Sequence, residues 1–329
     1  EYSTWQEEKN PDAEKLFSCV INCTKGTACR AIGHLLKENP ELFTIFRDTT
    51  EQMAADDHPI AKMSALFALY PIMKIDLSWA AEKILYIYQS DIRTLAFRKS
   101  KGILYQLYPE YRGKVSKIIR NGFDSTEEIL IEMAGYTLCE LYMMSDAFAE
   151  IVENPERLNE LQVNAILQMA IAYLRVGEKH EKAKMLILSC KDFSNSNRGA
   201  LSRIFREHFI SAENDAEFLL EIMSGKLDSR VVYDFSSFLE AEPGSVKEYA
   251  ELILTLCRNI LSRECGAEKS LWRPDREISK LVLDLYDECA GSAREKDKKI
   301  AEQCLDLWDM MFEKQIGQVR MLSRELMER

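Results

Sequence analysis

Glycine and proline are scarce in this chain, with 13 glycines and 8 prolines among 329 residues. This scarcity excludes collagen-like and Pro/Gly-rich low-complexity sequence. No apolar run approaches the roughly 20 residues that span a bilayer, and no secretory leader pattern opens the chain. Stretches with period-two alternation of apolar and polar residues are also missing, so we expect few strands or none. The expected class is therefore an all-helical, cytoplasmic protein without a membrane partner.

An excess of positive charge is missing as well. Lys and Arg total 43 against 54 Asp and Glu, which gives a net charge of −11. Because such a surface repels polyanions, nucleic acid and anionic lipid are not the expected partners. The nine cysteines are odd in number, scattered and set among apolar neighbours. We interpret them as free, buried thiols of a reducing compartment.

The patterns that carry common chemistries are not found. Cys19, Cys23, Cys29 and His34 have spacings that match no compact zinc site. The chain has no phosphate-binding loop, no dinucleotide fingerprint, no nucleophile elbow and no H-E-x-x-H pair. Its four histidines stand apart from one another. We therefore predict no catalytic residue, no metal site and no cofactor, and we expect the chain not to be an enzyme.

The stretch from Ser90 to Phe123 has the clearest helical periodicity. Ser90 is a candidate N-cap, and apolar residues then recur at three- and four-residue steps as far as Pro109. Val115, Ile118 and Ile119 mark the inner side of a second, shorter helix. The pattern predicts one antiparallel helix pair over 90–123, in which neither helix buries its apolar face alone.

Similar pairs recur along the chain. They are expected to begin near residues 27, 59, 91, 126, 158, 196 and 228, with spacings of about 35 residues. Asp91 and Arg93 at the mouth of one pair, with Asp228 and Arg230 at a matching position, fit the HEAT type. We predict an all-α, right-handed α-solenoid of antiparallel helical hairpins with HEAT-like repeats.

The predicted domain organisation has three parts: a HEAT-like solenoid over 1–261, a long loop over 262–276, and a C-terminal helical hairpin over 277–329 that caps the solenoid. Trp272 in the loop either packs against the solenoid or contacts a partner. In the last helix we expect a buried apolar stripe, made of Ala301, Cys304, Leu305, Trp308, Met311 and Phe312. Because Glu1 is not an initiator Met, we expect the chain to be either a fragment of a longer protein or a processed form.

One charged segment stands out against the acidic background. Between 91 and 120, two acidic residues are accompanied by eight basic ones, which are Arg93, Arg98, Lys99, Lys101, Arg112, Lys114, Lys117 and Arg120. These residues form either a solvated face with salt bridges between repeats, or a concave surface for an acidic partner. Together with Trp272 they are the candidate partner-binding residues.

Three segments resemble the C-terminal part of large bacterial STAND or NACHT-type NTPases. They are CRAIGHLL at 29–36, LVLDLY at 281–286, and CLDLWDMM at 304–311 with a closing Glu-Arg at 328–329. The resemblance implies a HEAT-like sensor or autoinhibitory region of an antiviral signalling ATPase, with the P-loop domain upstream. Its implied partner is a protein ligand or the parent protein's own NTPase domain.

Two functional hypotheses follow. The first is a non-catalytic protein-interaction solenoid that serves such a defence NTPase. The alternative is a HEAT-like nucleic-acid-binding protein, similar to alkyl-base DNA glycosylases, that uses the basic 91–120 surface.

Overall fold

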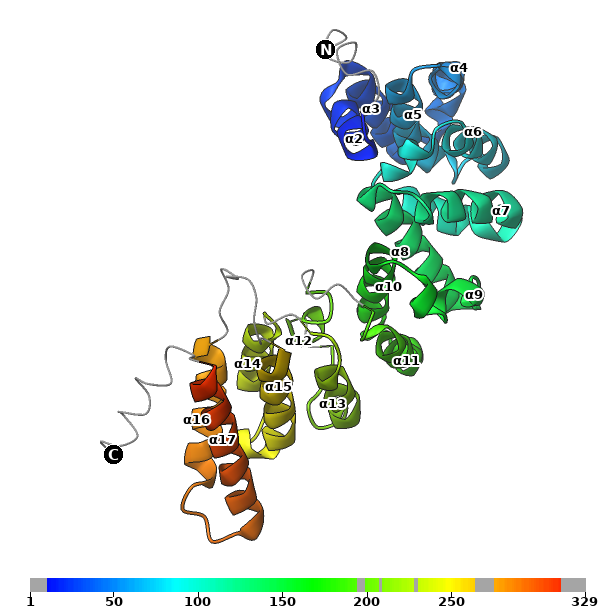
Figure 1. Cartoon of the computed structure of the whole chain (residues 1–329). Coiled ribbons are helices and arrows are strands. Elements are labelled where there is room, and N and C mark those ends of the chain that lie inside the picture. Colours follow the sequence, from blue (N-terminus) through cyan, green and yellow to red (C-terminus); the bar gives the residue numbers. More distant parts are fainter. Residues whose placement is uncertain (1–10, 194–198, 207–208, 228–229, 264–274, 315–329) are drawn as a thin grey trace. The chain divides into compact units, whose positions relative to one another are not determined.

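The computed structural model describes residues 11–193, 199–206, 209–227, 230–263 and 275–314, and all regular structure in these residues is helical (Figure 1). The all-α prediction is therefore confirmed. The chain divides into two compact units, Glu1–Val152 and Glu153–Arg329. The predicted boundaries at 261 and 277, and a right-handed HEAT-like solenoid through the whole chain, stay predictions. No described helix combines the length and apolar composition needed to cross a bilayer.

The first unit is built around α5. Its helices are α2 (Ala13–Asn22), α3 (Thr24–Glu38), η1 (Pro40–Leu42), α4 (Phe43–Ala55), α5 (Pro59–Ile72), α6 (Leu77–Ser90), η2 (Ile92–Ala96), α7 (Ser100–Phe123), α8 (Glu128–Ser145) and α9 (Ala149–Val152). Helix α5 is apolar along nearly its whole length, and α2, α3, α4 and α6 all contact it. A helix without a polar face is stable only when it is surrounded, so α5 is the core of this unit.

The first helix of the pair predicted over 90–123 begins at Ser100 and not after Ser90, so its predicted start is wrong. Ser90 closes α6, and the carboxylate of Asp91 instead caps the short 3₁₀ helix η2 by accepting the Arg93 amide at 3.0 Å. The guanidinium of Arg93 bonds the same carboxylate and also donates to the Pro11 carbonyl oxygen at 2.8 Å. A distant contact therefore selects Asp91 over Ser90 as the cap.

The break predicted at Pro109 lies two residues further along the chain. Helix α7 spans Ser100 to Phe123, and non-helical angles at Tyr111 (φ −117°, ψ 32°) divide it into two helical segments joined by a kink. A proline inside a helix removes one backbone hydrogen bond and bends the axis, which neighbouring contacts can hold. The main partner of α7 is α8, and Gly122 in its last turn lies against Leu95 of η2.

The second unit contains two rows of helices. Its elements are η3 (Pro155–Arg157), α10 (Glu160–Tyr173), η4 (Gly177–Lys179), α11 (His180–Cys190), α12 (Arg203–Arg206), α13 (Ala216–Ser224), α14 (Val231–Ala241), η6 (Val246–Tyr249), α15 (Ala250–Arg263), α16 (Asp275–Cys289) and α17 (Glu295–Glu313). Helix α13 contacts α11 and α15, and α15 contacts α17, whereas α14 contacts α12 and α16. From α11 to α17, each of these helices therefore contacts the helix two places further along.

The predicted pairs at 160–190 and at the end of the chain are confirmed as α10 with α11 and α16 with α17. The predicted stripe of α17 is confirmed at Cys304 and Met311, which are buried, and wrong at Leu305 and Phe312. Leu305 is 50% exposed and Phe312 is 42% exposed, while the buried line consists of Ile300, Cys304, Leu307 and Met311. Because α17 packs on both α15 and α16, contact with two helices sets its rotation. Residues 264–274, which include Trp272, lie outside the described residues.

Candidate functional site

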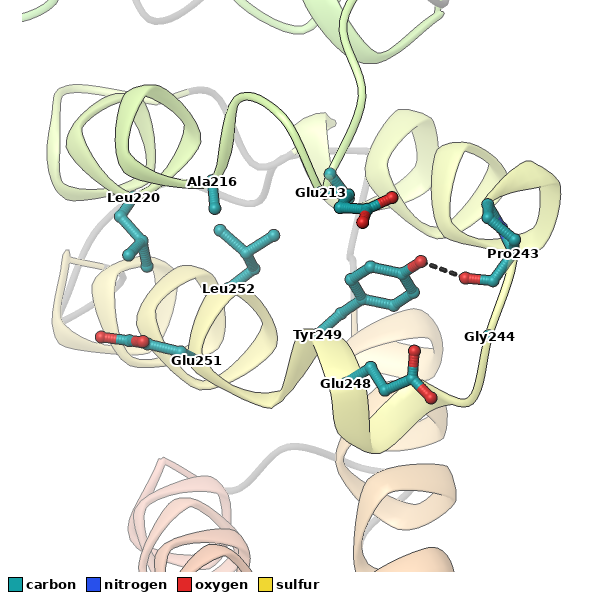
Figure 2. Close-up of a pocket in the computed structure, with 10 residues that line it drawn as sticks. Glu213, Ala216, Leu220, Pro243, Gly244, Glu248, Tyr249, Glu251 and Leu252 are labelled. Carbon is teal, nitrogen blue, oxygen red and sulfur yellow. Dashed lines mark hydrogen bonds between the residues drawn. The ribbon is translucent and has the colours of Figure 1, made fainter.

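Two grooves lie along the row formed by α11, α13 and α15. The first has a volume of about 450 Å³ and lies where α13 faces the loop after α14 and the start of α15. We name it the Tyr249 groove; its principal lining residues are Glu213, Leu220, Glu248, Tyr249, Glu251 and Leu252. Figure 2 shows these side chains coming from α13 and the residues just before it, and from η6 and the first turn of α15. Every charged side chain that lines it is a glutamate.

The loop between α14 and η6 gives the Tyr249 groove its shape. Gly244 has a φ of +106°, and a Cβ at that position would lie 2.4 Å from a carboxylate oxygen of Glu248. Only glycine adopts this conformation without strain. The Tyr249 hydroxyl donates to the Pro243 carbonyl oxygen (Figure 2), and the Glu242 carboxylate accepts the Ala212 amide at 3.0 Å. These contacts hold the loop against α13.

The electrostatics at Tyr249 reflect the acidic lining. Partial burial raises the pKa of the Tyr249 hydroxyl, and the carboxylates of Glu242, Glu248 and Glu213 raise it further. A negative charge on the ring oxygen is disfavoured beside other negative charges. The raised pKa therefore identifies three carboxylates within electrostatic reach of one aromatic ring.

The second groove lies between α11 and α13 and has a volume of about 540 Å³. We name it the Lys184 groove; its principal lining residues are Glu181, Lys184, Met185, Asp215, Phe218 and Glu221. Lys184 donates to Asp215 at 3.0 Å and lies 2.7 Å from a carboxylate oxygen of Glu181. Outside the lining, Lys191 pairs with Glu221 at 2.6 Å. Three of the five acidic residues that line this groove are thus paired with lysines of the same chain, whereas Glu213 and Glu217 have no ion pair with a described residue.

Asp215 is the centre of the polar contacts beside the Lys184 groove. Burial alone would raise its pKa, but hydrogen bonds from the Ser211 amide, Lys184 and His180 outweigh burial and lower it. The His180 Nδ1 lies 2.6 Å from the Leu174 carbonyl oxygen and Nε2 lies 3.3 Å from Asp215. Since a carbonyl oxygen only accepts, Nδ1 carries a proton. This network ties the end of α10 to α11 and to the start of α13.

Six of the eight basic residues predicted at 91–120 have partners within the first unit. Arg93 pairs with Asp91, Lys101 with Glu140 at 3.0 Å, and Arg120 with Glu150. The other three of the six lie against aromatic rings: Arg98 on Phe17, Lys99 on Tyr70 and Arg112 on Tyr108. Each of these six charged groups is therefore engaged by a carboxylate or an aromatic ring of the first unit.

The remaining two predicted residues, Lys114 and Lys117, are exposed on the last turns of α7 and have no ion pair within the described residues. The kink at Tyr111 separates them from Arg98 and Lys99, which belong to the loop before α7. The partner-binding surface predicted for residues 91–120 stays a prediction. Trp272 lies outside the described residues, so its proposed role as a partner contact stays a prediction.

The cysteines differ in their environments. Among the eight in the described part of the chain, all are free thiols; Cys19 and Cys23 are half-buried and the others buried. Burial raises the pKa of Cys29 to about 12, with a smaller contribution from Cys23. Within the described residues no three His, Cys, Asp or Glu side chains are arranged to hold a metal ion.

The glutamates of the Tyr249 groove were not among the predicted site residues. Glu213 and Glu248 lie 35 positions apart, about one predicted repeat, and Gly244 marks the turn between them. That spacing is a usable signal, because residues one repeat apart can face the same groove. In a chain with 54 acidic residues, however, the pattern is hidden among solvated carboxylates.

Comparisons with protein-family models, with curated proteins and with solved structures found no match to this chain.

Proposed function

We propose that this chain is a non-catalytic protein-interaction module whose second unit holds a segment of a partner protein. The observation that carries the proposal is the Tyr249 groove, an open concavity with an aromatic ring, methyl groups and carboxylates along consecutive helices. Repeat arrays bind partners along such grooves because each new helix extends the same surface.

The lining of the groove supports recognition of another protein. Its carboxylates provide directional hydrogen-bond acceptors, and Leu220 and Leu252 provide apolar area. Protein interfaces combine an apolar centre with a polar rim, and Tyr is enriched among their energetically important residues. The alternative of a nucleic-acid-binding protein receives less support, since six of the eight basic side chains at 91–120 have intramolecular partners.

The wider context remains part of the proposal. On the resemblance of residues 29–36, 281–286 and 304–311, we propose that the module is the C-terminal sensor or autoinhibitory region of a bacterial defence NTPase. Its partner is then a foreign protein or the parent protein's NTPase domain. The reading frame upstream of Glu1 is the direct check: a P-loop motif supports this origin, and a frame without one contradicts it.

Selection from a displayed library of random peptides tests the interaction function with the full chain as the target. Selected peptides are then synthesised, and binding to the chain is measured by fluorescence anisotropy. We expect saturable binding to the native chain and none to the heat-unfolded chain. Failure to recover any saturable binder over repeated selections contradicts the proposed function.

A further inference from the structure

The Tyr249 groove has two chemically different ends. Figure 2 shows Ala216, Leu220 and Leu252 together at one end, and Glu213 and Glu248 on either side of the Tyr249 ring at the other. A ligand that fills both ends must carry an apolar stem and a polar head. The sign of the lining charges then determines which head is accepted.

The carboxylates of the Tyr249 groove lack counter-charges. Glu213, Glu248 and Glu251 form no ion pair with any described residue, and no lysine, arginine or histidine lines the groove. In the neighbouring Lys184 groove, Lys184 and Lys191 pair with three of the five acidic lining residues. The Tyr249 groove differs because none of its three lining glutamates is paired with a described lysine or arginine.

The Tyr249 ring provides a second attraction for a cation. Its hydroxyl is engaged by the Pro243 carbonyl oxygen, which fixes the ring between the two glutamates (Figure 2). A cation over an aromatic face is attracted by the ring quadrupole, and nearby carboxylates add to that attraction. Lysine and arginine are the protein side chains that join such a head to an aliphatic stem.

We infer that the Tyr249 groove binds a lysine or arginine side chain of a partner protein. The stem lies on Leu220 and Leu252, and the ammonium or guanidinium group lies between Glu213 and Glu248 against the Tyr249 ring. This inference rests on the proposed function and adds the chemistry of the partner segment. An anionic ligand is repelled by the same carboxylates.

The test uses the full chain with labelled leucine methyl groups and small probes of one side chain each. Nα-acetyl-lysine methylamide and Nα-acetyl-arginine methylamide, whose side chains are charged, are compared with Nα-acetyl-norleucine methylamide, which keeps the aliphatic stem and lacks the charge. We expect the Leu220 and Leu252 methyl signals to shift saturably with the two cationic probes and not with norleucine. Equal shifts with norleucine, or no shift with the cationic probes, overturn the inference.

Variants establish which groups hold the head. Glu213→Gln combined with Glu248→Gln removes two charges at nearly constant volume, and we expect affinity for the lysine probe to fall about tenfold. The matched control is Glu110→Gln combined with Glu178→Gln, two exposed glutamates outside the groove, which leaves affinity unchanged. Circular dichroism and thermal unfolding confirm that both variants fold. If the two double variants lose the same amount of affinity for the lysine probe, the attraction comes from the overall negative charge of the chain, and the inference is overturned.

The aromatic contribution has its own pair of variants. Tyr249→Phe keeps the ring face and retains probe binding, whereas Tyr249→Leu keeps apolar volume and loses about threefold or more. Equal affinities of the two variants contradict a contact between cation and ring. The peptide selection separates this inference from the proposed function: saturable binders unaffected by the Glu213 and Glu248 changes support an interaction module and overturn the lysine pocket. If the cationic probes bind but no peptide binder is recovered, the lysine pocket is supported and the interaction module is contradicted.

Discussion

Helix α3 approaches α5 closely at Gly33, and this contact yields a quantitative prediction. A Cβ at Gly33 would lie 2.3 Å from the carbonyl oxygen of Phe67 on α5 and 3.1 Å from its carbonyl carbon. Real Cβ contacts stay above 3.0 Å. Because the obstacle is backbone, Gly33→Ala forces the two helices apart along the interface at the centre of the unit.

The magnitude follows from two opposing effects. Overpacking of this kind costs up to about 3 kcal/mol, and Ala is better than Gly in a helix by about 1 kcal/mol. We expect Gly33→Ala to lower the free energy of unfolding of the first unit by about 2 kcal/mol. Gly113 on α7 is the matched control, since nothing lies within 4 Å of its added Cβ. Gly113→Ala should stabilise the unit by up to about 1 kcal/mol.

Thermal unfolding followed by far-UV circular dichroism measures the difference. For a unit of this size each kcal/mol moves the Tm by about 2–4 °C, so Gly33→Ala should lower the Tm by about 4–8 °C. Hydrogen exchange of peptides from α5 assigns the change to the first unit, because protection there reports its local unfolding free energy. A Gly33→Ala chain at least as stable as Gly113→Ala would refute the close packing of α3 on α5.

Three further predictions concern charged groups and thiols. Asp91→Ala removes the η2 cap and the counter-ion of Arg93, whose side chain is only 19% exposed. The free energy of unfolding measured by urea titration should therefore fall by about 2–4 kcal/mol. Asp91→Asn should recover about 1 kcal/mol of this loss, and equal losses in the two variants would contradict the capping role. The pKa of Asp215 lies below its usual value, so its stabilising effect is present above pH ~4 and disappears as the pH falls through the folded-state pKa. Asp215→Asn should therefore flatten the acid limb of the stability profile, and an unchanged limb would contradict this. Burial raises the pKa of Cys29 to about 12, so iodoacetamide should label the half-buried Cys19 far faster than Cys29 in the native chain. Mass spectrometry of digests measures the two labelling rates, and equal rates would contradict the burial of Cys29.

Local signals in the sequence were sufficient for part of the fold. The helix at 160–173 begins with a capping box, in which Asn159 and Gln162 each bond the other's backbone amide at 3.0 Å. Residues three apart encode that motif completely, so the start of α10 is readable without tertiary information. The apolar sequence of α5 likewise indicates a central helix before any contact is known.

Other features depend on contacts between distant residues. Ser90 and Asp91 are adjacent, and both are good N-caps by residue type. The choice of Asp91 is tied to Arg93, which bridges to the Pro11 carbonyl oxygen 82 positions away. No window of local sequence contains that information.

The candidate site shows the difference between the charge of a segment and the charge that a partner meets. Residues 91–120 carry eight basic side chains, yet rings and carboxylates of the same unit engage six of them. In the Tyr249 groove, by contrast, Glu213 and Glu248 come from different turns, and neither has an ion pair with a residue in the described part of the chain. The chain as a whole has a net charge of −11, which adds to the negative potential of these two glutamates. Because such a field accelerates association with a basic partner, raising the salt concentration should slow binding of a lysine-containing segment more than it speeds release.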